Sequence, residues 1–107
     1  GDCSALQYTQ SMEIVSDTNE MWVIDVGRIN IWEDDPINDC PPKLLIFDLT
    51  TQQVIHRHIF PNAVLSYQAN FVNDIVVDPE GNYAYMSDTG VSAVGYNGGI
   101  IFFDRTR

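Results

Sequence analysis

Residues Met21–Gly27 read Met-Trp-Val-Ile-Asp-Val-Gly, and this short run carries the main structural information in the chain. A run of the same kind, Tyr83–Gly90, lies 63 residues further along (88 − 25 = 63) and also ends in Asp-x-Gly. Both runs are rich in apolar, aromatic and β-branched residues and are stopped by a glycine, which is typical of strands. The first run therefore predicts a strand, and its return predicts a repeated unit.

Two further segments recur in the same order. Ile14–Asp17 matches Ile75–Asp78 at an offset of 61 residues (75 − 14), and Leu45–Thr50 matches Ile101–Thr106 at an offset of 56 (101 − 45). Offsets that drift in this way are expected where loops differ in length, and the acidic stretch 28–42 is the main candidate for an insertion. One unit therefore reads as four strands joined by turns and loops.

The expected strands are short runs bounded by Gly, Pro, Asn or Asp, and no stretch of eleven or more residues shows a helical stripe. They are 20–26, 43–50, 53–60, 71–78, 82–88 and 99–104, with a weaker seventh at 11–17. A sandwich could also supply seven short strands, but an ordered four-stranded repeat of about 60 residues is typical of a β-propeller blade. We therefore expect an all-β class, and within it a fragment of a propeller.

The domain organisation follows from this repeat. Residues 1–107 are predicted to form one partial propeller domain of antiparallel sheet, with a complete blade at about 11–60 and an incomplete second blade at about 71–106. The chain begins without a basic or apolar leader and ends directly after a strand-like run. We expect it to be an internal piece of a longer protein whose remaining blades are its partners.

Charge and hydropathy exclude two classes of partner. The 107 residues include 5 basic and 15 acidic side chains, which gives a formal net charge of −10. Such a chain repels phosphate backbones and anionic lipids, so neither nucleic acid nor a membrane surface is an expected partner. Its apolar runs are too short to span a bilayer. The negative charge is compatible with cationic ligands.

The two cysteines are Cys3 and Cys40. They lack the Cys-x-x-Cys spacing of zinc and redox sites. Their separation alone is compatible with one disulfide or with two buried thiols.

Several segments together resemble the yellow / major royal jelly protein family. They are Met21–Gly27, the specific block Cys40–Thr51 with its Cys-Pro-Pro-Lys-Leu start, Phe60-Pro61 and Asn73–Asp78, and Gly1-Asp-Cys3 also fits. The resemblance covers nearly the whole chain. It implies a secreted, extracellular, six-bladed propeller, and it implies that Cys3 and Cys40 form a disulfide.

Asp88-Thr-Gly90 is the tripeptide of aspartic proteases, and Asp25-Val-Gly27 could be a degenerate partner. A protease needs two such carboxylates sharing a proton. Because both tripeptides fall at equivalent places of the repeat, where a strand must turn, we interpret them as structural.

Two groups of residues could bind a metal. His56 and His58 alternate with Arg57 on an outer strand, so both imidazoles share one face, but no third ligand is near in sequence. Glu33, Asp34, Asp35 and Asp39 offer the hard oxygens that Ca²⁺ prefers, without the spacing of a glycine-centred loop. An exposed polar edge strand and a solvated acidic loop are the favoured interpretations, and no metal or other cofactor is assigned.

Asn73 and Asp74 are the candidate ligand-binding residues, because they begin the first strand of the second unit and first strands line a propeller's channel. Propellers of the gluconolactonase / regucalcin type, which look related, place an Asn of such a pair on a channel metal. In the alternative interpretation Asn73 caps a turn and Asp74 accepts backbone hydrogen bonds.

The resemblance leaves two classes of function open. The first is a binder of a small amine or aromatic ligand, or a structural or nutritive protein, since the family includes amine-binding salivary proteins and nutritive or cuticle-associated proteins. The second is an enzyme, either a dopachrome-converting isomerase of the yellow type or, with less support, a metal-dependent lactonase. Function in a propeller depends on channel residues from every blade, so the fold alone does not choose between them.

Overall fold

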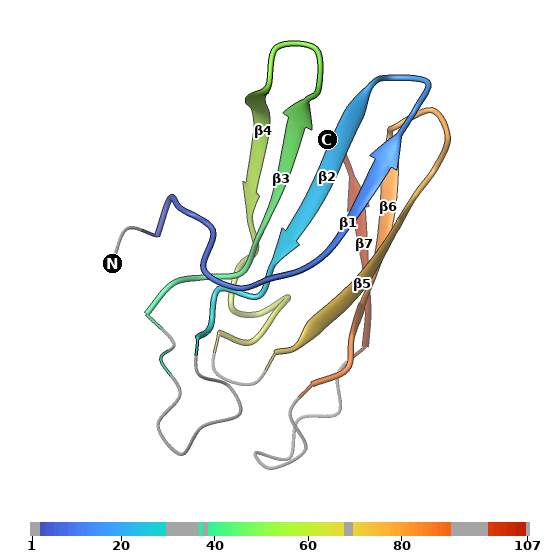
Figure 1. The fold of residues 1–107 in the computed structure, drawn as a ribbon. Helices are drawn as coiled ribbons and strands as arrows, with labels where there is room; N and C mark the ends of the chain where they lie inside the picture. Colours follow the sequence, from blue (N-terminus) through green and yellow to red (C-terminus); the bar gives the residue numbers. More distant parts are fainter. Residues whose placement is uncertain (1–2, 30–36, 38, 68–69, 91–98, 107) are drawn as a thin grey trace.

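The computed structural model describes residues 3–29, 37, 39–67, 70–90 and 99–106, and in these residues it contains strands and no helix (Figure 1). Nothing in the described part could therefore cross a membrane as a helix. The seven strands are β1 (Thr9–Val15), β2 (Glu20–Asp25), β3 (Lys43–Asp48), β4 (Gln53–Ile59), β5 (Val72–Val77), β6 (Tyr83–Asp88) and β7 (Gly99–Asp104). Each lies within or next to a run that the sequence predicts, including the weakest one at 11–17.

The strands form two antiparallel sheets in which each strand pairs with the next along the chain. The first sheet has the order β1-β2-β3-β4, and the second has the order β5-β6-β7. In Figure 1 the second sheet lies behind the first, with β1 and β5 side by side. The prediction of an all-β class with one four-stranded and one three-stranded meander is confirmed.

The repeat holds in three dimensions, but its first strand is shifted from the match expected from sequence. Thr9 pairs with Asp25 in the first sheet, and Val72 pairs with Asp88 in the second, so both strands align at an offset of 63 (72 − 9 and 88 − 25). The expected offset of 61 for the first strand is wrong. Side chains alternate with a period of two, so a slip of two residues preserves the apolar pattern and the sequence match could not reveal it.

The core lies between the two sheets. Trp22, Ile24 and Ile46 of the first sheet are fully buried against apolar residues of the second, among them Met86 and Phe103. The indole of Trp22 meets the ring of Phe103 edge-on, with centroids 5.9 Å apart. The strands β1 and β5, where the two sheets meet directly, are called the inner strands below. The rings of Trp22 on β2 and Phe103 on β7 fill the space between the sheets farther from these strands.

The opposite face of the second sheet is exposed and aromatic. Tyr85 and Phe102 are 54% and 53% exposed, although the equivalent residues of the first sheet, Trp22 and Ile46, are fully buried. Phe102 contacts both Tyr83 and Tyr85, with centroids 5.7 and 5.2 Å apart. The exposed face of the second sheet therefore corresponds to the face of the first sheet that packs on its neighbour. In a propeller, the next blade would pack on this exposed face in the same way.

A disulfide ties the residues before β1 to the loop that leads into β3. Cys3 and Cys40 are bonded, with Cα atoms 5.2 Å apart. The ammonium of Lys43, at the start of β3, lies beside this bridge and donates hydrogen bonds to the carbonyl oxygens of Cys3 and Ala5. The disulfide implied by the family resemblance is present, and it anchors the N-terminal segment to the first sheet.

Candidate functional site

Asn73 and Asp74 lie on β5 where that strand faces β1. The Nε2 of Gln10 donates a hydrogen bond to Asn73 Oδ1 at 3.1 Å, and the hydroxyl of Ser11 donates to Asp74 Oδ1 at 3.1 Å. At the structural offset of 63, Gln10 is the equivalent of Asn73 and Ser11 is the equivalent of Asp74. The candidate residues therefore take part in two side-chain hydrogen bonds, Gln10–Asn73 and Ser11–Asp74, which join equivalent positions of the two sheets and are called rungs below.

A β-bulge explains why these side chains reach across. The pairing register shifts between Thr9 and Ser11 in β1 and between Val72 and Asp74 in β5. The residue inside each bulge is left out of the ladder of its own sheet and the strand bends there. Gln10 and Asn73 are these two residues, and the bend at each bulge re-aims their side chains, which hydrogen-bond to each other.

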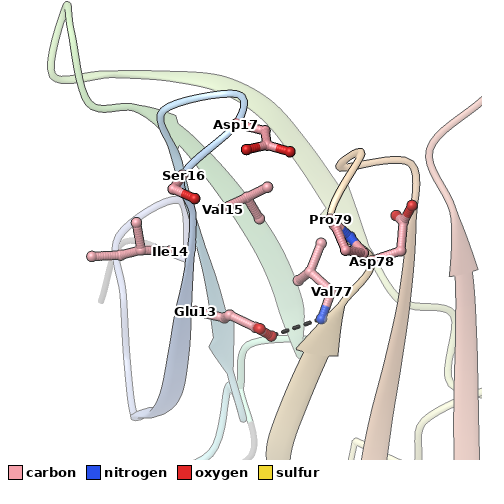
Figure 2. Close-up of a pocket in the computed structure, with 8 residues that line it drawn as sticks. All are labelled: Glu13, Ile14, Val15, Ser16, Asp17, Val77, Asp78 and Pro79. Atoms are coloured by element: carbon pink, nitrogen blue, oxygen red, sulfur yellow. Dashed lines mark hydrogen bonds between the residues drawn. The ribbon is translucent and has the colours of Figure 1, made fainter.

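Carboxylates also satisfy backbone groups on the free edge of β5. The amide of Ile75 donates to Asp74 Oδ1 at 2.8 Å, and the amide of Val77 donates to Glu13 Oε2 at 2.7 Å (Figure 2). An unpaired strand edge is a template for unwanted pairing, and side-chain acceptors block it. Asp74 thus accepts a backbone donor, as the structural interpretation anticipates. Asn73 accepts from Gln10 instead of capping a turn.

A shallow cavity opens beyond Glu13, between the ends of β1 and β5 (Figure 2). Its volume of about 180 Å³ is below the several hundred Å³ of most small-molecule sites. Asp78, on its rim, accepts hydrogen bonds from the backbone amides of Tyr83, Asn82 and Glu80, which lower its pKa. Because Glu13 and Asp78 already accept hydrogen bonds from backbone amides, we assign the cavity to the junction of the β1 and β5 ends and not to a ligand.

Asp25 has a structural environment. Its carboxylate accepts backbone hydrogen bonds from Gln7, Tyr8 and Gly27 at 2.8 to 2.9 Å and pairs with Lys43 at 3.0 Å, with both side chains buried. It therefore holds the segment before β1 against the end of β2.

Asp88 occupies the equivalent place in the second sheet. It accepts backbone hydrogen bonds from Phe71 at 2.8 Å and from Gly90 at 3.0 Å. Both Asp-x-Gly tripeptides are thus turns in which the carboxylate bonds to the amide two residues on and to the chain entering the sheet. This arrangement supports their structural interpretation over a protease dyad.

Comparison with known proteins agrees with this geometry. A sequence model of the family described as "Major royal jelly protein" matches residues 11–106, which include all of the second sheet and nearly all of the first. The chain belongs to the major royal jelly protein family. The fold of this family is a β-propeller, and the two antiparallel sheets of four and three strands agree with it.

Curated relatives of this family member carry the name "Protein yellow". The proteins from Drosophila erecta and Drosophila guanche are 32% and 33% identical over 102 and 101 residues, and the one from Drosophila melanogaster is 31% identical over 101. Each alignment covers 91% of this chain and 18% of the relative. The chain therefore spans less than a fifth of the length of these proteins.

The two histidines of this family member share one face of β4 and Arg57 takes the other, as alternation predicts. The strand β4 is the edge of its sheet and is mostly exposed, as expected, but the two imidazoles are half-buried because both rings pack against Phe103 of the second sheet. Burial lowers the pKa of His58, and the nearby His56 lowers it further. No group of three potential metal ligands exists in the part of the chain that the structure describes. Glu33, Asp34 and Asp35 lie outside that part, and Asp39 is exposed.

Sequence reasoning missed Gln10 and Ser11, the partners of the candidate residues. The signal that could have found them is the repeat itself, read at an offset of 63 for the first strand. At that offset Gln10-Ser11 aligns with Asn73-Asp74, which places two consecutive polar residues at the same point of both inner strands.

Proposed function

We propose that this chain forms part of the channel wall of a secreted, six-bladed propeller protein, and that the channel binds a small cationic or aromatic ligand in contact with Asn73 and Asp74. The observation that carries the proposal is the hydrogen bonding of this pair. Each residue uses one oxygen for its rung, and among the described residues no hydrogen bond is donated by Asn73 Nδ2 or accepted by Asp74 Oδ2. One donor and one anionic acceptor are thus available on the exposed inner strand.

These two groups suit a ligand that carries an ammonium group and a hydrogen-bond acceptor. A charge-assisted bond to a carboxylate is about twice as strong as a neutral one, so Asp74 would supply most of the polar affinity. The net charge of −10 enriches cations near the protein, an effect that fades as the ionic strength rises. The extracellular location rests on family membership and agrees with the Cys3–Cys40 disulfide.

The alternative is an enzyme. The family resemblance implies a yellow-type, dopachrome-converting isomerase as the first enzyme alternative, ahead of a metal-dependent lactonase, and the matched relatives are named "Protein yellow". In either case Asn73 and Asp74 would contribute one wall of a site whose other residues come from the remaining blades.

The test uses the full-length protein that contains this chain and isothermal titration with serotonin, dopamine and Ca²⁺. We expect Asn73→Ala and Asp74→Asn to weaken binding of the amine, the latter by about tenfold or more, since a hydrogen bond to a charged group contributes about 1.5–3 kcal/mol. Glu80→Gln is the matched control, because it removes the same charge from an exposed turn of the second sheet.

Each outcome decides between the proposals. Unchanged amine affinity in both variants would remove the pair from the site, and a wild-type protein that binds none of the three probes would contradict ligand binding in the channel. Tight binding of Ca²⁺ with no amine binding would favour the lactonase. Conversion of dopachrome by the wild type would favour the isomerase.

A further inference from the structure

The outer junction of the two sheets is built from five rings, Trp22, His56, His58, Phe60 and Phe103, which we call the outer wedge. The ring of Phe103 stands at its centre. Its centroid lies 5.9 Å from that of Trp22, 5.8 Å from His56 and 5.0 Å from His58. His58 also meets Phe60 edge-on at 4.8 Å. The two imidazoles therefore take positions that apolar rings would otherwise fill.

The surroundings of His58 favour the neutral form of its imidazole. On β3, the residues paired with His58 and His56 are Leu44 and Ile46, both apolar and fully buried. Arg57 points to the other face of β4. A protonated imidazole here would lose water without gaining a partner on its own sheet, and two of them on one face would repel each other.

Charged and titratable groups of the facing elements are few in the described residues. Asp104 and Tyr83 line the same open cavity as His58, and Asp104 accepts hydrogen bonds from the amide and the hydroxyl of Thr106. Arg105 lies over the ring of Trp22 and is paired with Glu20. Burial lowers the pKa of His58, and the charge of a protonated His56 would lower it further.

We propose that His58 makes the outer wedge an acid-sensitive contact, which is closed at neutral pH and opens when its imidazole takes up a proton. A histidine whose pKa is lower in the folded state stabilises fully above its unfolded pKa of about 6.5, and the contribution is lost as the pH falls through the folded pKa. Glu20 keeps its pairing with Arg105 in this range because its own pKa is lowered from an already acidic value. This pair holds the end of β7 next to Arg105, and the bonds from Gln10 and Ser11 hold the inner strands together. The opening is therefore confined to β4 and to the part of β7 around Phe103.

The test is hydrogen–deuterium exchange of the full-length protein at pH 7.5 and 5.5, corrected for the pH dependence of intrinsic exchange. We expect peptides over 53–59 and 99–104 to lose protection several-fold at pH 5.5, while peptides over 20–25 and 83–88 do not. His58→Phe should abolish the difference between the two pH values. Arg57→Gln, on the opposite face of the same strand, should leave the difference as in the wild type.

Equal protection of 53–59 at both pH values in the wild type would overturn the proposal without any variant. It would also be overturned if His58→Phe lost protection at pH 5.5 as the wild type does. Because a phenylalanine could overpack the wedge, His58→Gln serves as a second, non-titrating variant. It is expected to be less protected at both pH values and to show no difference between them.

Discussion

Both terminal nitrogens of Arg105, one residue beyond β7, bind the two carboxylate oxygens of Glu20 at the start of β2. Nη1 donates at 2.8 Å and Nη2 at 2.9 Å, across 85 positions of the chain. Glu20 also accepts hydrogen bonds from Thr18 Oγ1 and Trp22 Nε1, and the guanidinium lies 5.8 Å from the centre of the Trp22 ring. This bidentate pair fastens the two sheets at the hairpin end, opposite the rungs of the candidate site.

The first prediction concerns this ion pair. Glu20→Gln should lower the free energy of unfolding by about 2 kcal/mol. Breaking an exposed ion pair costs ~0.2–1 kcal/mol and breaking a fully buried one costs ~3–5 kcal/mol. This pair lies between the two cases, because the side chain of Glu20 is 8% exposed and that of Arg105 is 26% exposed. Urea unfolding of the full-length protein measures it. Glu80→Gln, at an exposed turn, should change stability by less than about 0.5 kcal/mol. An equal loss in both variants would contradict a specific role for the pair.

The second prediction is the pH dependence of the same pair. Burial raises the pKa of Glu20, but the bonds from Arg105, Thr18 and Trp22 outweigh it and bring the pKa below the usual 4.5. A carboxylate with a lowered folded pKa stabilises above its unfolded pKa and loses this contribution as the pH falls through the folded value. The stability gap between wild type and Glu20→Gln should therefore narrow as the pH falls below 4.5. A gap that stays constant between pH 6 and pH 3 would show that the charge of Glu20 does not stabilise the junction.

The third prediction compares two glycines. Gly27 has a φ of +79°, and a Cβ there would lie 2.5 Å from the carbonyl oxygen of Pro41, whereas a Cβ on Gly99 would meet nothing within 4 Å. Gly27→Ala should cost more than about 2 kcal/mol, because backbone strain and a clash with main-chain atoms add together. Gly99→Ala should be close to neutral. Thermal unfolding of the two variants side by side checks this, and equal melting temperatures would refute it.

The fourth prediction concerns the disulfide. Closing a loop of 38 residues (40 − 3 + 1) between Cys3 and Cys40 stabilises by about 4 kcal/mol in the chain-entropy model. The double variant Cys3→Ala/Cys40→Ala should lose a stability of this order in denaturant unfolding without reductant. If its unfolding midpoint matches that of the wild type, the bridge does not constrain the unfolded chain.

The fifth prediction applies to residues 1–107 produced alone. The exposed aromatic face of the second sheet, around Tyr85 and Phe102, should make this chain associate, because a solvent-exposed apolar patch of this kind favours contact with another surface. Analytical ultracentrifugation should show larger species that Tyr85→Lys reduces, while Ile14→Lys, on exposed β1, does not. A sharp unfolding transition that is independent of protein concentration would contradict this expectation.

Much of the fold was accessible from sequence because its signals are local. All seven strands were predicted within a few residues, since alternation, β-branched composition and turn residues act over five to eight positions. The roles of Asp25 and Asp88 as turn residues also follow from their place in the repeat. The first-strand offset of 61 failed because a period of two cannot distinguish a register from one that is shifted by two residues.

The local pattern of the sequence thus determined the strands, their order and the family, together with the polar pair Asn73-Asp74 as a candidate. Only the packing of one sheet on the other decided which partners these residues have. Gln10 meets Asn73, Arg105 meets Glu20, and the two histidines meet Phe103, all between residues more than 40 positions apart. Such contacts depend on where the strands bulge and on how far apart the two sheets lie at each point along the strands. The alternation of side chains within a single strand carries no information about either.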